Sequence, residues 1–237
     1  MFSGTTEHVS LRATLPGVPV PITNAEETAH LLDLLADQKD PELTQAVALA
    51  LSDDGFRQKL VQGLTAKSDV FRYNCVRVLQ ELSTGNPDTL YPYWDDLVPL
   101  LDSPNAYHRT TAVLLLANLT GADVDRRFVS LLDRYFERLD DEKIVTARHL
   151  VKALPAITAS YQDLIPTISA RLLCVEDTHH AEGRKDLLKG DVVEAFEVLF
   201  DHVPDKKSVL AFVEAQLGSS SPRTRKAAKA FLGRHAA

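Results

Sequence analysis

A short motif recurs three times along the chain, and its spacing constrains the fold more than any other feature. In each copy a polar turn leads to an arginine, with a small residue three positions later and a leucine seven positions after the arginine. The copies hold Arg72, Cys75 and Leu79; Arg109, Ala112 and Leu116; and Arg225, Ala228 and Leu232. The small residue and the leucine are four apart and share one helical face, where a small side chain lets a neighbouring helix approach closely. Such repetition predicts stacked helical units.

Weaker copies of the same register fill the intervals between the clear ones. They are headed by Thr44, Ile144 and Lys189, which replace the arginine. Together the copies define a unit of about 36 residues, with a short first copy and an insertion in the fifth. The repeat length therefore predicts one pair of helices in each unit.

Helical periodicity continues from Asn24 to the end of the chain. Strand-like alternation is missing, and short polar turns join consecutive amphipathic stretches, as antiparallel neighbours require. We mark twelve helical segments, at 25–36, 42–51, 54–66, 70–83, 91–101, 106–119, 124–139, 142–157, 160–174, 185–202, 206–217 and 223–234. The sequence predicts an all-α fold, a right-handed α-solenoid of about six antiparallel helical pairs over residues 24–237.

The first 23 residues differ from the rest of the chain. Pro16, Pro19 and Pro21 lie close together there, and each proline fixes φ and removes an amide donor. A helix is therefore excluded in this stretch. We predict an extended N-terminal arm over residues 1–23, preceding the solenoid.

Charge and composition exclude several classes of protein. The net charge of -7 disfavours polyanion binding by the molecule as a whole. No run approaches the roughly 18 apolar residues that cross a bilayer, and residues 1–15 do not read as a secretory signal. The two cysteines, Cys75 and Cys174, are too few for a disulfide framework, which fits a reducing compartment. We expect a cytoplasmic protein.

Two segments place a proline inside an apolar run, at 96–102 (DLVPLLD) and 163–169 (DLIPTIS). Together with the turn, arginine and small residue described above, they resemble the first and second helices of HEAT repeats. The resemblance covers residues 24–237 and is clearest in the second, third and sixth units. It implies a stack whose second helices line a concave surface for partners. Armadillo-like stacking is the near alternative, and the sequence does not separate the two.

The motif arginines, Arg72, Arg109 and Arg225, have two interpretations. They could form a basic ladder for an anionic ligand. The family resemblance instead implies that each arginine bonds an acidic group or a helix end of a neighbouring repeat. We favour this structural role.

The last helical segment is strongly basic. No acid follows Glu214, and the segment contains Arg223, Arg225, Lys226, Lys229 and Arg234. Such asymmetry would orient an acidic peptide, a nucleic acid or an anionic membrane surface. We favour a solvated capping helix, because a terminal repeat needs a polar outer face. Phe231 is the only aromatic there for base stacking.

Residues 175–186 form the insertion in the fifth unit. The side chains in and beside it that could bind a metal are Cys174, Asp177, His179, His180 and Glu182. Neither CxxC nor HExxH spacing occurs, and a structural zinc site needs four converging ligands. We therefore predict a mobile polar loop, with no metal and no cofactor.

The chain lacks recognisable catalytic motifs. The sequences G-x-S-x-G, GxxxxGK[ST] and GxGxxG do not occur, and Cys75 replaces an alanine of the repeat, as a buried small hydrophobe would. Deoxyhypusine hydroxylases share the architecture but use His-Glu pairs, which this chain lacks. HEAT-like alkylpurine DNA glycosylases use a basic, aromatic-lined face, whereas this chain is acidic with one tryptophan. No catalytic residues are expected.

The sequence thus predicts a non-enzymatic scaffold or adaptor that binds a protein or peptide on the concave second-helix surface. The predicted contact residues are Arg77, Gln80, Asn118, Arg148, Lys152, Arg225 and Lys229. The alternative is a nucleic-acid-binding, glycosylase-like protein that uses the basic C-terminal helix. A HEAT protein that handles a pigment or another modification is a third possibility, on family analogy alone.

Overall fold

The computed structural model describes residues 24–235, and within this range every element is a helix and no strand occurs. The predicted arm over residues 1–23 lies outside the described residues. The α-helices are α1 (Asn24–Asp37), α2 (Thr44–Ser52), α3 (Asp54–Gly63), α4 (Asp69–Gly85), α5 (Pro87–Leu90), α6 (Trp94–Leu97), α7 (Ala106–Leu119), α8 (Arg127–Phe136), α9 (Ile144–Ser160), α10 (Ile165–Leu173), α11 (Glu182–Leu199), α12 (Lys206–Ala215) and α13 (Pro222–His235). The predicted all-α class is confirmed.

Short turns of 3₁₀ helix extend or connect these helices. They are η1 (Tyr91–Tyr93), η2 (Val98–Asp102), η3 (Thr120–Ala122), η4 (Glu137–Asp140), η5 (Gln162–Leu164), η6 (Cys174–Asp177), η7 (Phe200–His202) and η8 (Gln216–Gly218). None of the described helices is long and apolar enough to cross a membrane.

Polar side chains start the helices at the turns that the sequence predicts. The Ser68 hydroxyl accepts the Phe71 N–H at the start of α4, and the Asn105 side chain accepts the Tyr107 N–H at 2.9 Å at the start of α7. These bonds satisfy amides that have no partner within the helix. Helix α7 has the predicted bounds, and α4 differs from its prediction by two residues or fewer at each end.

The predicted helix over 91–101 is wrong as a single element. The structure breaks this stretch into η1, α6 and η2. Pro92 lies in the first turn of η1, and Pro99 lies in the first turn of η2. Because proline cannot donate the hydrogen bond that a helix interior requires, each proline begins a new helical turn instead.

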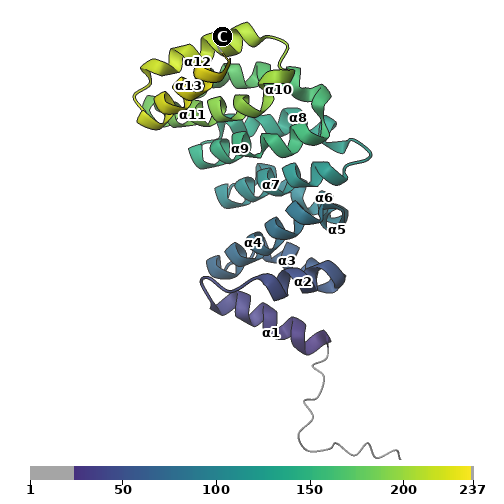
Figure 1. Ribbon diagram of the computed structural model, residues 1–237. Helices are drawn as coiled ribbons and strands as arrows, with labels where there is room; N and C mark the ends of the chain where they lie inside the picture. Colours follow the sequence, from purple (N-terminus) through teal and green to yellow (C-terminus); the bar gives the residue numbers. More distant parts are fainter. Residues whose placement is uncertain (1–23, 236–237) are drawn as a thin grey trace, which may run out of the picture.

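The long helices pack in succession along the molecule (Figure 1). Helix α4 contacts α7, α7 contacts α9, α9 contacts α11, and α11 contacts α13. The segments between them, from α5 to η2 and then α8, α10 and α12, lie beside this row as a second layer. From α4 to α13, consecutive long helices of the row are therefore in contact with each other.

The N-terminal end departs from the predicted pairing of helices. Three helices, α1, α2 and α3, precede α4 and all contact it. The Asn74 side chain on α4 donates to the carbonyls of Leu35 at 2.8 Å and Gln38 at 2.7 Å, and so binds the C-terminal end of α1. The weak copy headed by Thr44 is therefore not the second helix of a simple pair.

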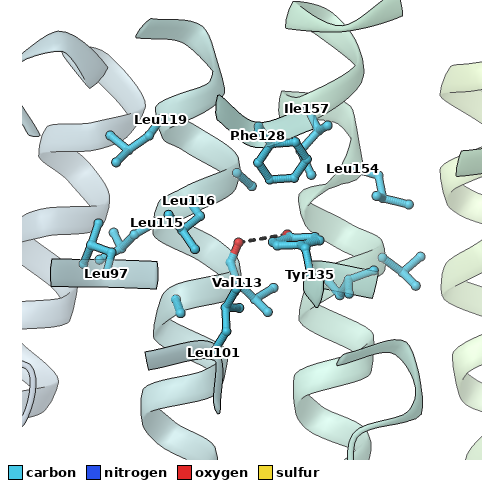
Figure 2. Packing of buried hydrophobic residues seen from close by; sticks show 14 of the residues in the cluster. Leu97, Leu101, Val113, Leu115, Leu116, Leu119, Phe128, Tyr135, Leu154 and Ile157 are labelled. Carbon is cyan, nitrogen blue, oxygen red and sulfur yellow. Dashed lines mark hydrogen bonds between the residues drawn. The ribbon is translucent and has the colours of Figure 1, made fainter. Parts of the chain in front are cut away.

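Buried apolar side chains join the two layers. Figure 2 shows Leu97 and Leu101 from the second layer and Leu116 from α7, with Phe128 of α8 near α9. These side chains are fully buried, and burying each one stabilises the fold by about 1.5–3 kcal/mol. The Tyr135 hydroxyl, also buried, donates to the Val113 carbonyl at 2.9 Å (Figure 2). A polar group in this core is thus satisfied.

The small residue of the repeated motif lies where two helices approach closely. Cys75 on α4 is fully buried against Gly63, the last residue of α3. A Cβ atom on Gly63 would lie only 2.5 Å from the Cys75 sulfur. The predicted close approach is therefore present between α3 and α4.

Candidate protein-binding face

One side of α4, α7, α9 and α11 is exposed along the row, and we call it the second-helix face. Its residues recur at helical spacings of three, four or seven, which places them on one side of each helix. They are Tyr73, Arg77 and Gln80; Tyr107, Leu114 and Asn118; Val145, Arg148 and Lys152; and Asp191, Glu194 and Val198, all at least partly exposed except the buried Asp191. The five contact residues predicted between Arg77 and Lys152 all lie on this face.

Two exposed aromatic side chains occupy adjacent helices of this face. Tyr73 on α4 is 57% exposed and Tyr107 on α7 is 71% exposed. The Arg77 guanidinium lies 5.8 Å from the centroid of the Tyr73 ring, and Arg72 lies at the same distance from the Tyr107 ring. Val145, near the start of α9, is also more than half exposed. Tyrosine and arginine are the residue types enriched at protein interfaces.

The predicted contact residues on α4 and α7 are partly engaged within the fold. Arg77 forms an ion pair with the exposed Asp40 at 2.7 Å. The Asn118 side chain donates to the hydroxyl of Ser83 at 2.9 Å, and it thereby joins α7 to α4. Gln80 is half-buried on the same side of α4. Of these polar groups, Arg77 contacts an exposed aromatic ring, that of Tyr73.

Arg148 on α9 binds a buried carboxylate. Asp191 on α11 is 2% exposed, and Arg148 Nη2 donates to its Oδ1 at 3.2 Å while Nε donates to Oδ2. Arg223 of α13 lies 3.1 Å from the same carboxylate, and Lys152 lies 4.0 Å from it. The hydrogen bond to Asp191 raises the pKa of Arg148 above its usual value. Arg148 therefore joins two helices, whereas the half-exposed Lys152 remains accessible.

The motif arginines bond the turn ahead of their own helix. Arg72 donates to the Ala66 carbonyl at 2.7 Å, Arg109 donates to that of Ser103 at 2.8 Å, and Arg225 donates to that of Ser219 at 2.6 Å. The acceptor is six residues before the arginine in every case. These contacts show a structural role, but the predicted bond to an acidic group of a neighbouring repeat is made by Arg109 alone, and Arg72 reaches α7 through the Tyr107 ring.

Arg109 forms a buried ion pair with Asp141, in the turn that leads into α9. Its Nε donates to Asp141 Oδ2 at 2.6 Å, and its Nη2 donates to Oδ1 at 2.8 Å. Burial alone would raise the pKa of Asp141, but the hydrogen bonds from Arg109 and from the Lys143 backbone outweigh it and hold the pKa below its usual value. This pair links consecutive units through the core.

Arg225 and Lys229 do not join the second-helix face. Arg225 donates to backbone carbonyls, and Lys229 is exposed and forms no ion pair within residues 24–235. The side of α13 that borders α11 instead presents Arg223, which binds Glu194, and Arg234, which binds Glu197. Much of the basic charge of α13 is therefore paired with carboxylates of α11.

The insertion over 175–186 is not the predicted mobile loop over most of its length. Residues up to Asp177 belong to η6, and α11 begins at Glu182. The Lys185 ammonium donates to the Glu176 carbonyl at 2.8 Å, and Lys189 forms an ion pair with the Glu176 carboxylate at 2.6 Å. These contacts explain why the segment is helical. Among the described residues, no three His, Cys, Asp or Glu side chains are placed to hold a metal ion.

Tyr73, Tyr107 and Asp191 are the prominent residues of this face that sequence reasoning missed. Tyr73 follows the first motif arginine directly, and Tyr107 precedes the second by two positions. Because the motif fixes which side of each helix is buried, extending it by one turn would have marked both tyrosines as exposed. A buried Asp191 had no such signal, since its partners come from α9 and α13.

Comparisons with known proteins bear on the fold. No family model matches the chain, and no curated protein matches it. The crystal structure of an engineered protein, a target of the Northeast Structural Genomics Consortium, is similar with a TM-score of 0.50. The match covers 90% of this chain and 91% of that one at 15% sequence identity. The likeness is one of fold alone.

Proposed function

We propose that this chain is a HEAT-type α-solenoid that acts as a non-enzymatic scaffold and binds a protein or peptide on its second-helix face. The repeat of about 36 residues and the nearest-neighbour packing of the long helices support the architecture. In such a stack one side of each long helix stays exposed, because its neighbours along the row cover only the flanks. A preformed surface of this kind lowers the ordering cost of binding.

The exposed pair Tyr73 and Tyr107 is the observation that favours protein binding. Both rings lie mostly in solvent although each has a large apolar surface, and an arginine accompanies each one. A partner that covers the rings would gain their apolar burial and would use Lys152 and Arg77 for charge contacts. The predicted cytoplasmic location suits the free thiol of the exposed Cys174.

The test is affinity capture from nuclease-treated extract of the source cell, with three baits read by mass spectrometry. The baits are the wild type, the double variant Tyr73→Ser/Tyr107→Ser and a control, Val124→Ser/Leu217→Ser, which changes exposed apolar residues elsewhere. We expect a stoichiometric protein on the wild type and the control, reduced about tenfold on the tyrosine variant. Equal capture by all three baits would refute the placement of the site.

The alternative, nucleic-acid binding through α13, has weaker support. Arg223, Arg225 and Arg234 are bonded within the fold, and the net charge is -7. Lys226 and Lys229 are the lysines of α13, and both are exposed and form no ion pair within residues 24–235. This alternative predicts binding of single-stranded DNA at low salt that Lys226→Glu/Lys229→Glu abolishes. Nuclease-sensitive loss of every captured partner would favour it.

A further inference from the structure

A groove of about 890 Å³ lies between α8 with η4 and α10 with η6, outside the second-helix face. Both helices belong to the second layer of Figure 1. Phe136 and Leu139 form the buried floor, and the exposed Pro166 and Ala170 flank it. The groove thus offers an apolar strip between two neighbouring helices.

Carboxylates surround this apolar strip. They are Asp133, Glu137, Asp140 and Asp177, and Arg171 is the one lysine or arginine that lines the groove. The side chains of Asp133, Glu137 and Asp140 are 87%, 63% and 51% exposed. Each is therefore accessible to a ligand in the groove.

The cations nearby neutralise only part of this charge. Arg171 binds Asp133 and lies over the Phe136 ring, and Arg138 contacts Glu137 at 3.2 Å. The His179 ring bonds Asp140 at 2.6 Å. Asp177 forms no ion pair within residues 24–235. An excess of negative charge remains along the rim, and it has the same sign as the net charge of the chain.

We propose that this groove binds a basic amphipathic helical segment of a partner protein. The apolar side of the segment would pack on Phe136, Pro166 and Ala170, and its lysines or arginines would meet Glu137 and Asp177. Two layers of the molecule would then carry two independent docking surfaces. The proposal does not depend on the second-helix face.

Cys174 provides a reporter inside the groove. It lines the groove and is exposed, whereas Cys75 is fully buried and burial raises the pKa of its thiol to about 12. N-ethylmaleimide, a neutral reagent, therefore modifies Cys174 selectively in the folded chain. A ligand seated in the groove slows this modification.

The experiment measures the rate of Cys174 modification in the full chain as a helical peptide is added. The probe is a 14-residue peptide, about four helical turns, with leucine on one face and lysine on the other, and a matched peptide replaces lysine with glutamate. We expect the lysine peptide to slow modification about fivefold in a saturable way at low salt, with the effect weakened at high salt. The glutamate peptide should leave the rate unchanged.

Two variants locate the interaction. Glu137→Gln/Asp177→Asn removes two rim charges, and Glu214→Gln/Asp125→Asn makes the same charge change at exposed acids elsewhere. Each rate is compared with that of the same variant without peptide. We expect about tenfold weaker protection in the first variant only. Equal protection in both variants, or by the glutamate peptide, overturns the proposal. Protection that rises with protein concentration alone would overturn it in favour of a second copy of the chain.

Discussion

At the scale of single residues, the arginine of the repeated motif makes different contacts in different copies. Arg72, Arg109 and Arg225 all bond a carbonyl six residues earlier, but Arg109 alone adds a buried carboxylate. The turn contact was foreseeable from the repeat, because the arginine follows a polar turn each time. The Asp141 contact was not, since it depends on how the next unit is placed.

Replacing the motif arginine should therefore lower the free energy of unfolding most in the third unit, at Arg109. Arg109→Met leaves Asp141 buried without its main cation, so we expect the free energy of unfolding to fall by about 3–5 kcal/mol. Arg72→Met is the matched control, because its acidic partner Asp69 is exposed, and we expect about 1 kcal/mol there. Urea denaturation measures both. Equal losses of unfolding free energy in the two variants would show that the buried Arg109–Asp141 pair adds nothing to stability.

His149 gives the chain a stability that depends on pH. Burial lowers its pKa, and the positive charges of Lys152 and Arg148 lower it further. Because the folded state binds the proton of such a histidine less tightly than the unfolded state does, protonation favours unfolding. The stability is therefore fully present above the unfolded pKa of about 6.5 and is lost as the pH falls below it. We expect the free energy of unfolding to decrease between about pH 7 and about pH 5. This decrease should be shallower in His149→Gln than in the wild type. In the control His202→Gln, at an exposed position, it should equal that of the wild type.

At the scale of helices, local signals predicted the elements well where caps and periodicity agree. The bounds of α7 follow from Asn105 and its regular pattern. Prediction failed where local rules compete, as between Pro92 and Pro99, where apolar periodicity favoured one helix. It also failed at the insertion, where the contacts of Lys185 and Lys189 with η6 stabilise a helix that polar composition disfavours.

The contact of α3 with α4 depends on the absence of a side chain at Gly63. In Gly63→Ala the added methyl would meet the Cys75 sulfur, so we expect destabilisation of about 1–3 kcal/mol. Cys75→Ala removes the sulfur, and the double variant should be more stable than the two single losses predict. Gly85→Ala, where a Cβ meets no atom within 4 Å, is the control and should be neutral or stabilising. Strict additivity in thermal or urea unfolding would contradict this account.

At the scale of the whole molecule, the serial packing of the long helices leaves two separate surfaces exposed among the described residues. The row of long helices exposes Tyr73 and Tyr107, while the second layer exposes the acidic groove at Glu137 and Asp177. The repeated motif indicated the all-α class of this fold and which side of each helix is buried. The sequence alone did not indicate the groove, because its two sides lie on helices of different units.

Hydrogen–deuterium exchange of the chain with its captured partner tests the central claim most directly. Backbone amides of helices that a partner covers open less often, so their exchange slows. The proposal predicts slowed exchange in α4 and α7, around Tyr73 and Tyr107, with α12 and α13 unchanged. Slowed exchange confined to α13, with α4 and α7 unaffected, would contradict protein binding at the second-helix face.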